Sequence, residues 1–249
     1  MDFIKNFNQD VVSLDTTAEF TPRIVTWACT SCDSELKKKE CVSNGKYCAM
    51  NHKGTYVQGK DIIMEDLREK CLHTLLKEDK AVNKWWDYMA YVHKMCYEEV
   101  NEDCSKMGHK SIGREYQKTV DCVTSSFEGS NPVKDDNRIL RAESEAWKEY
   151  GTAYWPSVVI NDRTYRGDLV PDAVFNAICA GFNDEPSACT NFKIEAGIVK
   201  EPEGITGNAL IIVVVVLVLV NLLLIWAYRR CTNKEIKDDM QLQVNSAVS

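Results

Sequence analysis

The sequence predicts an α/β domain with a helical insertion, rich in disulfides and followed by a single transmembrane helix. Two observations predict this class, and a third concerns its partners. The expected elements run strand, block of helices, hairpin, helix. All of the 11 cysteines except Cys231 precede one uninterrupted apolar segment, residues 209–228. The net charge is -7, without a basic stripe, which argues against a nucleic-acid partner.

The elements before the helical insertion are short. Residues 1–22 are polar and mixed and are expected to be a lead-in linker. RIVTWAC, residues 23–29, is short and β-rich, which is typical of a buried strand. Residues 32–48 are a cysteine-rich loop with a turn at Asn44-Gly45. We therefore expect a domain over residues 23–192 that starts with one strand and a cross-linked loop.

Apolar spacing predicts the helical insertion. Residues 60–78 carry apolar side chains at helical intervals, and Asp61 can cap this helix. Residues 83–96, 113–127 and 138–151 repeat the amphipathic pattern. Trp85 and Trp86 are adjacent, so they point in different directions from a helix. One of them is expected in the core, and a ligand platform is the alternative.

After these helices the periodicity changes. WPSVVI and RTYRG, separated by Asn161-Asp162, have the pattern of a β-hairpin. A helix is expected over residues 170–182, with Pro171 at its start and Gly181 at its end. Residues 193–208 are then expected to form a short stalk.

The Cys29-x-x-Cys32 pattern has two interpretations. The element order is that of a thioredoxin fold with an inserted helical domain, in which a cis-proline before the hairpin lies against the two cysteines. X-Pro bonds are the ones that adopt cis, so Cys29, Cys32 and Pro156 could form a thiol–disulfide oxidoreductase site. The alternative is a structural disulfide, because Asp33 and Glu35 would disfavour a thiolate and other cysteines are available as partners.

The cysteines before the apolar segment are expected to form disulfides in an oxidising compartment. Their spacing leaves the pairing open. The histidines lack metal-ligand spacing, and neither a phosphate-binding loop nor a catalytic serine motif occurs, so no metal, cofactor or enzymatic activity is predicted. The cysteines expected in disulfides are Cys29, Cys32, Cys41, Cys48, Cys71, Cys96, Cys104, Cys122, Cys179 and Cys189.

Residues 209–228 are uncharged and long enough for one membrane span. As a helix they would extend about 30 Å, the hydrocarbon thickness of a bilayer. Cations follow this stretch and acidic residues precede it, so the positive-inside rule places residues 229–249 in the cytosol and residues 1–208 in the lumen. The cysteine distribution favours the same topology. The sequence therefore predicts a single-pass type I membrane protein.

Several blocks of the sequence, in order, resemble the vacuolar sorting receptors best known from plants. They are FTPRIVTWAC, ECVSNGKYCAM, GKDIIMEDLREKC, KWWDYMAYVHKMC, WPSVVINDRTYRG and VFNAICAGFNDEPSAC, and the similarity covers about residues 2–189. The resemblance implies a thioredoxin-like domain that is not a redox enzyme. It also implies a cargo receptor, which binds sorting peptides of soluble hydrolases in the Golgi and delivers them to endosomes, lysosomes or vacuoles.

The chain departs from this family's pattern at both ends. The family's protease-associated domain is absent and MDFIKNFNQDVV lacks the apolar core of a signal peptide, so we expect the chain to be a fragment of a longer protein. The family's calcium-binding epidermal-growth-factor-like repeats are also absent, so no calcium site is expected. Cys41 and Cys48 fall at the family's spacing, whereas Cys32 does not.

The tail is expected to couple the receptor to cytosolic coat adaptors. Family tails carry a Tyr-x-x-hydrophobic signal, but Tyr228 abuts the bilayer and cannot serve. Cys231, next to the membrane, is a candidate for S-palmitoylation. EIKDDMQL resembles the family's acidic-plus-hydrophobic signal, and a disordered polar tail is the alternative. The candidate signal residues are Glu235, Ile236, Asp238, Asp239, Met240 and Leu242.

The predicted function is binding and transport. We expect a receptor of Golgi and endosomal or vacuolar membranes, with lumenal sorting peptides and cytosolic coat adaptors as partners. Release of cargo in an acidic compartment would need protonation of a histidine or of a carboxylate with a raised pKa. The alternative function is a membrane-anchored thiol–disulfide oxidoreductase that uses Cys29 and Cys32, with Pro156 positioning the substrate.

Overall fold

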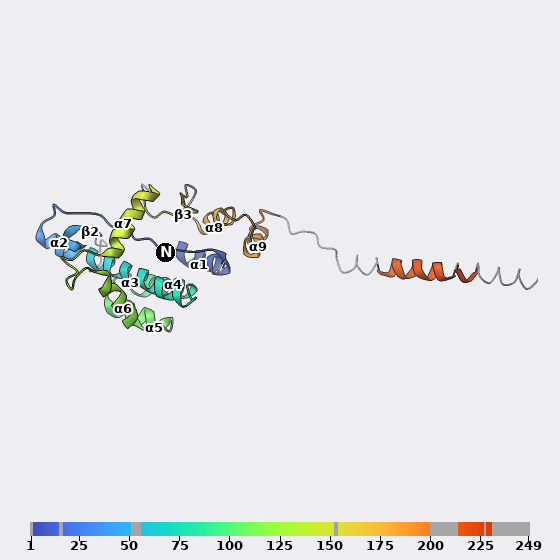
Figure 1. Cartoon of the computed structure of the whole chain (residues 1–249), viewed down its shortest axis with the longest axis horizontal. Coiled ribbons are helices and arrows are strands. Elements are labelled where there is room, and N and C mark those ends of the chain that lie inside the picture. Colours follow the sequence, from blue (N-terminus) through green and yellow to red (C-terminus); the bar gives the residue numbers. More distant parts are fainter. Residues whose placement is uncertain are drawn as a thin grey trace, which may run out of the picture. The chain divides into compact units, whose positions relative to one another are not determined.

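The structure, a computed structural model, describes residues 2–14, 17–50, 56–151, 154–199, 214–226 and 228–230. The chain divides into two compact units, Met1–Ala196 and Gly197–Ser249. The helices and strands labelled in Figure 1 all lie in the first unit.

The first unit is mostly helical where it is described. Helix α3 is central, because it packs against α2, α4, α5 and α6 and against both strands of the first sheet. In Figure 1, α7, β3 and α8 lie along the upper side of this unit, and α4, α5 and α6 lie along the lower side. The helices are α1 (Asp2–Leu14), α2 (Ser34–Glu40), α3 (Gly59–Glu78), α4 (Asn83–Met95), α5 (Glu102–Ser111), α6 (Tyr116–Ser126), α7 (Arg138–Tyr150), α8 (Pro171–Cys179) and α9 (Ser187–Glu195).

The strands are few, so the expected α/β class holds only in part. Within the described residues, β1 (Cys41–Val42) pairs with β2 (Tyr47–Cys48), β3 (Val159–Ile160) pairs with β4 (Arg163–Thr164), and no larger sheet forms. The strand expected at residues 23–29 is an extended segment that pairs only through a bridge between Trp27 and Cys48. Side chains replace a second strand there: Lys70 donates to the carbonyl of Pro22, and Glu143 accepts from the N–H of Ile24.

The hairpin predicted around Asn161-Asp162 is present. Both turn residues have positive φ, 48° and 61°, as a two-residue hairpin turn requires. Val159 pairs with Thr164 in its register. Helix α8 follows, with Pro171 in its first turn as the sequence pattern indicated.

Helix α1 lies within the stretch expected to be a lead-in linker. Phe7 and Leu14 are 5% and 2% exposed and belong to the larger core cluster. The ring of Phe7 meets that of Trp86 edge to face at 5.8 Å, and α1 packs against α4 and α8. Phe3, Phe7, Val11 and Leu14 form a helical stripe that reveals this helix in the sequence.

Both adjacent tryptophans of α4 enter the core. Trp85 is 4% exposed and Trp86 is 3% exposed, so the alternative of a ligand platform is wrong. Phe20 lies against both rings, at 5.1 Å and 4.6 Å. The indole N–H of Trp85 donates to the backbone carbonyl of Glu69 at 3.1 Å, which satisfies the buried donor. Two neighbouring positions are buried because α1, α3 and the extended segment surround this end of α4.

Five disulfides staple the first unit. Cys71–Cys122 joins α3 to α6 and closes a loop with a sequence separation of 51. The other bridges are local, with separations between 3 and 10. The five pairs are Cys29–Cys32, Cys41–Cys48, Cys71–Cys122, Cys96–Cys104 and Cys179–Cys189.

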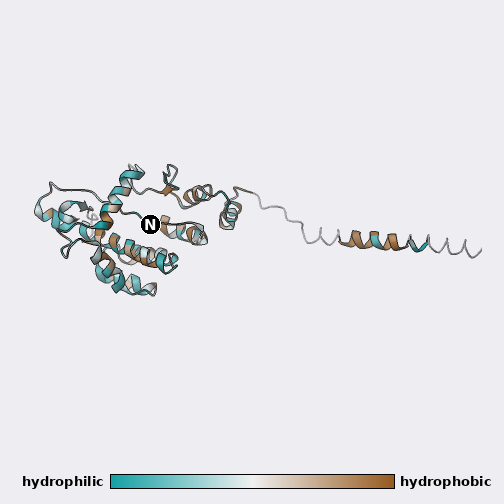
Figure 2. Cartoon of the chain, in the orientation of Figure 1, coloured by the Kyte–Doolittle hydropathy of each residue, from teal (hydrophilic) through white to brown (hydrophobic). Residues whose placement is uncertain are grey.

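In the second unit, residues 214–226 and 228–230 are helical. Their side chains are exposed, and Figure 2 shows the hydrophobic colour along most of this helix. Among the described residues, no helix has both the length and the apolar character that crossing a membrane demands. The predicted span, residues 209–228, extends beyond the described residues, and the tail signal at 235–242 and Cys231 lie outside them.

Candidate functional site

Two tryptophans bring together the chain segments that carry the Cys-x-x-Cys and the proline. The rings of Trp27 and Trp155 meet edge to face, with their centroids 5.0 Å apart. Trp27 lies two residues before Cys29, which is disulfide-bonded to Cys32. Trp155 is joined to Pro156 by a cis peptide bond. Segments from opposite ends of the domain therefore meet at one site.

The cysteine-rich loop holds the Cys-x-x-Cys in place. Trp27 exchanges two backbone hydrogen bonds with Cys48, at 2.9 and 2.7 Å, and the N–H of Cys29 donates to the carbonyl of Gly45 at 2.8 Å. Gly45 has a φ of +84°, and a Cβ there would lie 2.7 Å from the carbonyl oxygen of Cys29. Because only glycine tolerates both conditions, the turn predicted at Asn44-Gly45 serves to seat Cys29.

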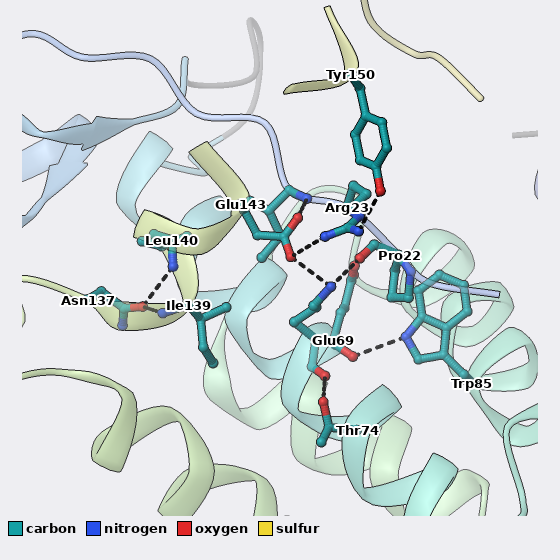
Figure 3. Close-up of polar contacts among 12 residues, drawn as sticks. Pro22, Arg23, Glu69, Thr74, Trp85, Asn137, Ile139, Leu140, Glu143 and Tyr150 are labelled. Atoms are coloured by element: carbon teal, nitrogen blue, oxygen red, sulfur yellow. Dashed lines mark hydrogen bonds and ion pairs between the residues drawn. The ribbon is translucent and has the colours of Figure 1, made fainter. Parts of the chain in front are cut away.

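A buried carboxylate anchors the segment that leads into this site. Glu143 on α7 lies 2.7 Å from Lys70 Nζ of α3 and 3.4 Å from Arg23 Nη1. Its other oxygen accepts from the backbone N–H of Ile24 at 3.3 Å. Figure 3 shows Glu143 and Arg23 pointing toward each other, and Arg23 also donates to the hydroxyl of Tyr150 at 3.0 Å. Glu143 thus ties the extended segment to two helices.

Charges of both signs flank the disulfide. Asp33 caps α2, because its Oδ1 accepts from the N–H of Leu36 at 2.8 Å, so this carboxylate serves the helix N-terminus. Lys37 turns back and donates to the carbonyl of Thr30 at 2.6 Å, inside the Cys-x-x-Cys loop. The acidic surroundings inferred from Asp33 and Glu35 therefore include a cation that sequence reasoning missed. Its position one turn into a helix that starts beside the loop is the signal for it.

The site is open to solvent. Trp155 is 55% exposed and Tyr154 is 81% exposed, while Cys29 and Cys32 are half-buried. Exposed aromatic rings contact apolar side chains of a peptide with little loss of rotamer freedom. A disulfide within reach of solvent can also exchange with thiols. The arrangement therefore supports two chemistries, peptide binding and thiol–disulfide exchange.

Two histidines, His73 and His109, are packed against other side chains. His73 lies between the rings of Phe20 and Trp85, at 5.7 and 6.1 Å, and burial lowers its pKa to about 4. Burial also lowers the pKa of His109, whose Nε2 lies 2.9 Å from the hydroxyl oxygen of Thr119. These two histidines are therefore neutral near pH 7.

Among the described residues, one cluster has side chains of the kinds that bind metal ions, but their ligand atoms already take part in other interactions. It consists of Cys179, Glu185 and Cys189. The two sulfurs are bonded to each other, and the carboxylate of Glu185 lies 2.6 Å from Lys193 Nζ. This cluster is therefore a disulfide beside an ion pair. Its one carboxylate, that of Glu185, is the only acidic ligand that it could offer to a metal ion.

Helix α3 carries one buried carboxylate, Glu65, and two half-buried ones, Asp66 and Glu69, that the helical pattern did not reveal. Glu65 accepts from Arg68 Nε at 2.8 Å and from the hydroxyl of Tyr88 at 2.5 Å. Burial, followed by the charge of Glu65, raises the pKa of Asp66 to about 7. Burial and the charges of Asp66 and Glu65 also raise the pKa of Glu69 well above its usual range. Asp66 therefore titrates near neutral pH.

The chain matches a protein family over most of its length. The family model described as vacuolar sorting receptor thioredoxin-like domain matches residues 1–179. Two similar proteins of Arabidopsis thaliana are vacuolar-sorting receptor 7, 32% identical, and vacuolar-sorting receptor 6, 30% identical, each over 82% of this chain and 34% of the relative. Vacuolar-sorting receptor 1 of Pisum sativum is 30% identical over 78% of this chain and 33% of its own length.

The match includes the site described above. Residues 1–179 contain the Cys29–Cys32 disulfide, both tryptophans and Pro156. The chain spans about a third of the length of the curated relatives it matches. The resemblance of the sequence blocks and the thioredoxin-like domain are confirmed by the family match. The chain therefore belongs to the vacuolar sorting receptor family.

Proposed function

We propose that this chain is a membrane cargo receptor, which binds sorting peptides of soluble hydrolases in the Golgi lumen and carries them toward endosomes, lysosomes or vacuoles. Membership of the vacuolar sorting receptor family supports a sorting role. Within the domain, the proposal is carried by the exposed aromatic side chains of Trp155 and Tyr154, of which Trp155 contacts Trp27 in the segment that leads to the Cys29–Cys32 disulfide.

The construction of this face supports peptide binding. The ring of Trp155 rests against Trp27, and Trp27 is held by two backbone hydrogen bonds to Cys48. A large aromatic residue on such a support offers contact area without having to become ordered first. Binding then loses less side-chain entropy, which favours affinity.

The peptide-binding site is tested with the full chain in detergent micelles. A fluorescent sorting peptide from a soluble vacuolar hydrolase is titrated against wild type and Trp155→Ala, which we expect to bind about tenfold more weakly or worse. Met95→Ala removes a comparably exposed apolar side chain, 58% exposed, from α4, and is expected to bind as wild type does. Equal affinity for wild type and Trp155→Ala would reject this site.

We further propose a domain organisation for the chain. It comprises a lead-in at 1–22 that includes α1, a lumenal domain at 23–192, a stalk at 193–208, a transmembrane helix at 209–228 and a cytosolic tail at 229–249. The flanking charges and the helical, apolar residues 214–226 support it. Protease added to sealed microsomes should remove the tail and spare the cysteine-rich domain. A protected tail would overturn this orientation.

The tail is proposed to bind coat adaptors through residues 235–242, with Cys231 S-palmitoylated beside the bilayer. The acidic residues ahead of Met240 and Leu242 support the first role. Replacing Met240 and Leu242 with alanine should weaken adaptor capture by the tail, and Cys231→Ser should abolish incorporation of labelled palmitate. Unchanged capture or unchanged labelling would each reject the corresponding role.

A second candidate function, thiol–disulfide exchange, is favoured by the half-buried Cys29–Cys32 bridge, whose segment contacts the Trp155-Pro156 segment through Trp27. A substrate thiolate would attack one sulfur and form a mixed disulfide, and a second substrate thiol would resolve it. The substrate is oxidised to a disulfide and the protein is reduced to two thiols. Selective reduction of this bridge by mild dithiothreitol, with folding of Cys29→Ser/Cys32→Ser intact, would support exchange. A bridge that resists reduction and is needed for folding would reject it.

A further inference from the structure

A hollow opens on the first unit where α5 leads into α6. Its volume is about 530 Å³. A smaller hollow of about 240 Å³ adjoins it, and its wall combines leucines of α3 with carboxylates, among them Leu72, Leu75, Leu76, Glu78, Asp79 and Glu115. The larger hollow is lined by cationic and apolar side chains and one carboxylate: Lys106, Lys110, Arg114, Met107, Tyr116 and Glu115.

Most of the cationic side chains at the larger hollow form no ion pair or hydrogen bond with the described residues. Lys106 and Lys110 lie one turn apart on α5 and are exposed, and their side chains make no hydrogen bond or ion pair with any residue that the structure describes. Lys84 Nζ donates to the carbonyl of Ile112 at 3.0 Å and brings another ammonium group to the rim. The chain as a whole has a net charge of -7, whereas the larger hollow is lined by three cations and one carboxylate.

Arg114 lies at the wall shared by the two hollows. Its Nη1 pairs with Asp79 at 2.5 Å. Its Nε is buried and has no hydrogen-bond acceptor among the described residues. Buried donors are nearly always paired, so the Nε of Arg114 is an unusual unpaired donor, while the rest of this side chain is 27% exposed at the wall.

The lining favours a peptide over a small anion. Met107 is 52% exposed and Tyr116 is half-buried beside the lysines, and a phosphate ion would leave both unused. Gly113 lines both hollows and has no side chain to separate them. An extended peptide could therefore lie across both hollows, with its carboxylates at Lys106 and Lys110 and an apolar side chain toward Leu75, which is half-buried.

We propose that these two hollows form a binding site for an acidic peptide segment that also carries apolar residues. The site is separate from the Trp27–Trp155 face. It extends the proposed receptor function and rests on it, because it names a second chemical feature by which a soluble partner would be recognised. Lys106, Lys110 and Arg114 bind the carboxylates, and Met107 and Tyr116 contact the apolar side chains.

The test uses the full chain in detergent micelles and a short fluorescent peptide in which glutamates alternate with leucines. We expect saturable binding that weakens as salt is added, and at least about tenfold weaker binding after Lys106→Glu/Lys110→Glu, because like charges would then face each other. The same peptide with glutamines in place of glutamates should bind about tenfold more weakly. Lys134→Glu/Lys148→Glu makes the same charge change at exposed lysines elsewhere and should leave binding unchanged.

Three results would overturn the site: equal binding of the glutamate and glutamine peptides, equal weakening by both lysine pairs, or displacement of the peptide by inorganic phosphate at the peptide's own concentration. The last result would indicate a simple anion site. Failure here is distinguishable from failure of the receptor proposal, because the hydrolase sorting peptide is measured separately on Trp155→Ala. If the wild-type chain binds the sorting peptide but not the acidic peptide, this site alone is rejected.

Discussion

At the residue scale, one carboxylate joins three parts of the domain. Glu143 is 5% exposed and contacts Lys70 and Arg23 as well as the backbone of the segment that leads to Trp27. Replacing it with glutamine leaves Lys70, 15% exposed, without a counter-charge. We expect Glu143→Gln to lower the free energy of unfolding by about 3 kcal/mol, the low end for a broken buried pair. Urea denaturation measures this, and Glu149→Gln, exposed on the same helix, should change little.

His73 shows how burial of one ring makes stability depend on pH. Its pKa is lowered to about 4 in the folded protein, below the ordinary value of about 6.5. The unfolded chain therefore takes up the proton first, and stability is lost as the pH falls from about 6.5 toward 4. Between pH 7 and pH 5 this loss amounts to about 2 kcal/mol. His73→Phe should remove that part of the decline in urea denaturation at the two pH values, and an unchanged decline would contradict this assignment.

At the element scale, the bridge between α3 and α6 is expected to stabilise the fold more than the bridge at the candidate site. Cys71–Cys122 closes a separation of 51 and Cys29–Cys32 a separation of 3, so removal should cost about 4 and about 2 kcal/mol respectively in the chain-entropy account. Cys71 is also fully buried. Thermal denaturation of the two double alanine variants gives the order. A larger drop in Tm for Cys29→Ala/Cys32→Ala would contradict it.

Helix α1 can be predicted from the sequence only when the spacing of its apolar residues is considered. Residues 1–22 are polar on average, yet Phe7 and Leu14 are among the buried core residues. Average polarity hides an amphipathic helix, because only one face has to be apolar. The segment around Trp27 is the opposite case. Its β-rich composition predicted a strand, but α3 and α7 supply side-chain partners to its backbone and a full ladder does not form.

At the scale of the whole molecule, the half-buried acid Asp66 and the buried histidine His73 shift stability in opposite directions with pH. The pKa of Asp66 is raised from 3.8 to about 7, so the unfolded chain loses this proton first. The resulting destabilisation is absent below about pH 4 and grows as the pH rises toward 7. Lowering the pH therefore reduces the destabilisation due to Asp66 and increases the destabilisation due to His73. The domain's free energy of unfolding should then vary less between pH 7 and 5 than either residue alone implies.

Asp66→Asn tests this balance. The variant should be more stable than wild type by about 2 kcal/mol at pH 7.5, a figure reduced for the partial exposure of Asp66, and the gain should shrink at pH 5. Chemical denaturation at both pH values measures it. Asp103→Asn, exposed on α5, is the control without an expected gain. A gain of equal size at both pH values would show that proton binding by Asp66 is not its cause.

The sequence by itself determined the features that depend on composition and local order: a cysteine set suited to an oxidising compartment, the hairpin turn, the helical periodicity of α3, α4, α6 and α7, and the ordered blocks that identify the family. Only the tertiary structure decided which cysteines pair, that Trp27 meets Trp155, that Glu143 holds the segment before them, and that both Trp85 and Trp86 are buried. Periodicity reports which face of an element is apolar. It does not report which distant element covers that face, and these contacts join residues that are far apart in the chain.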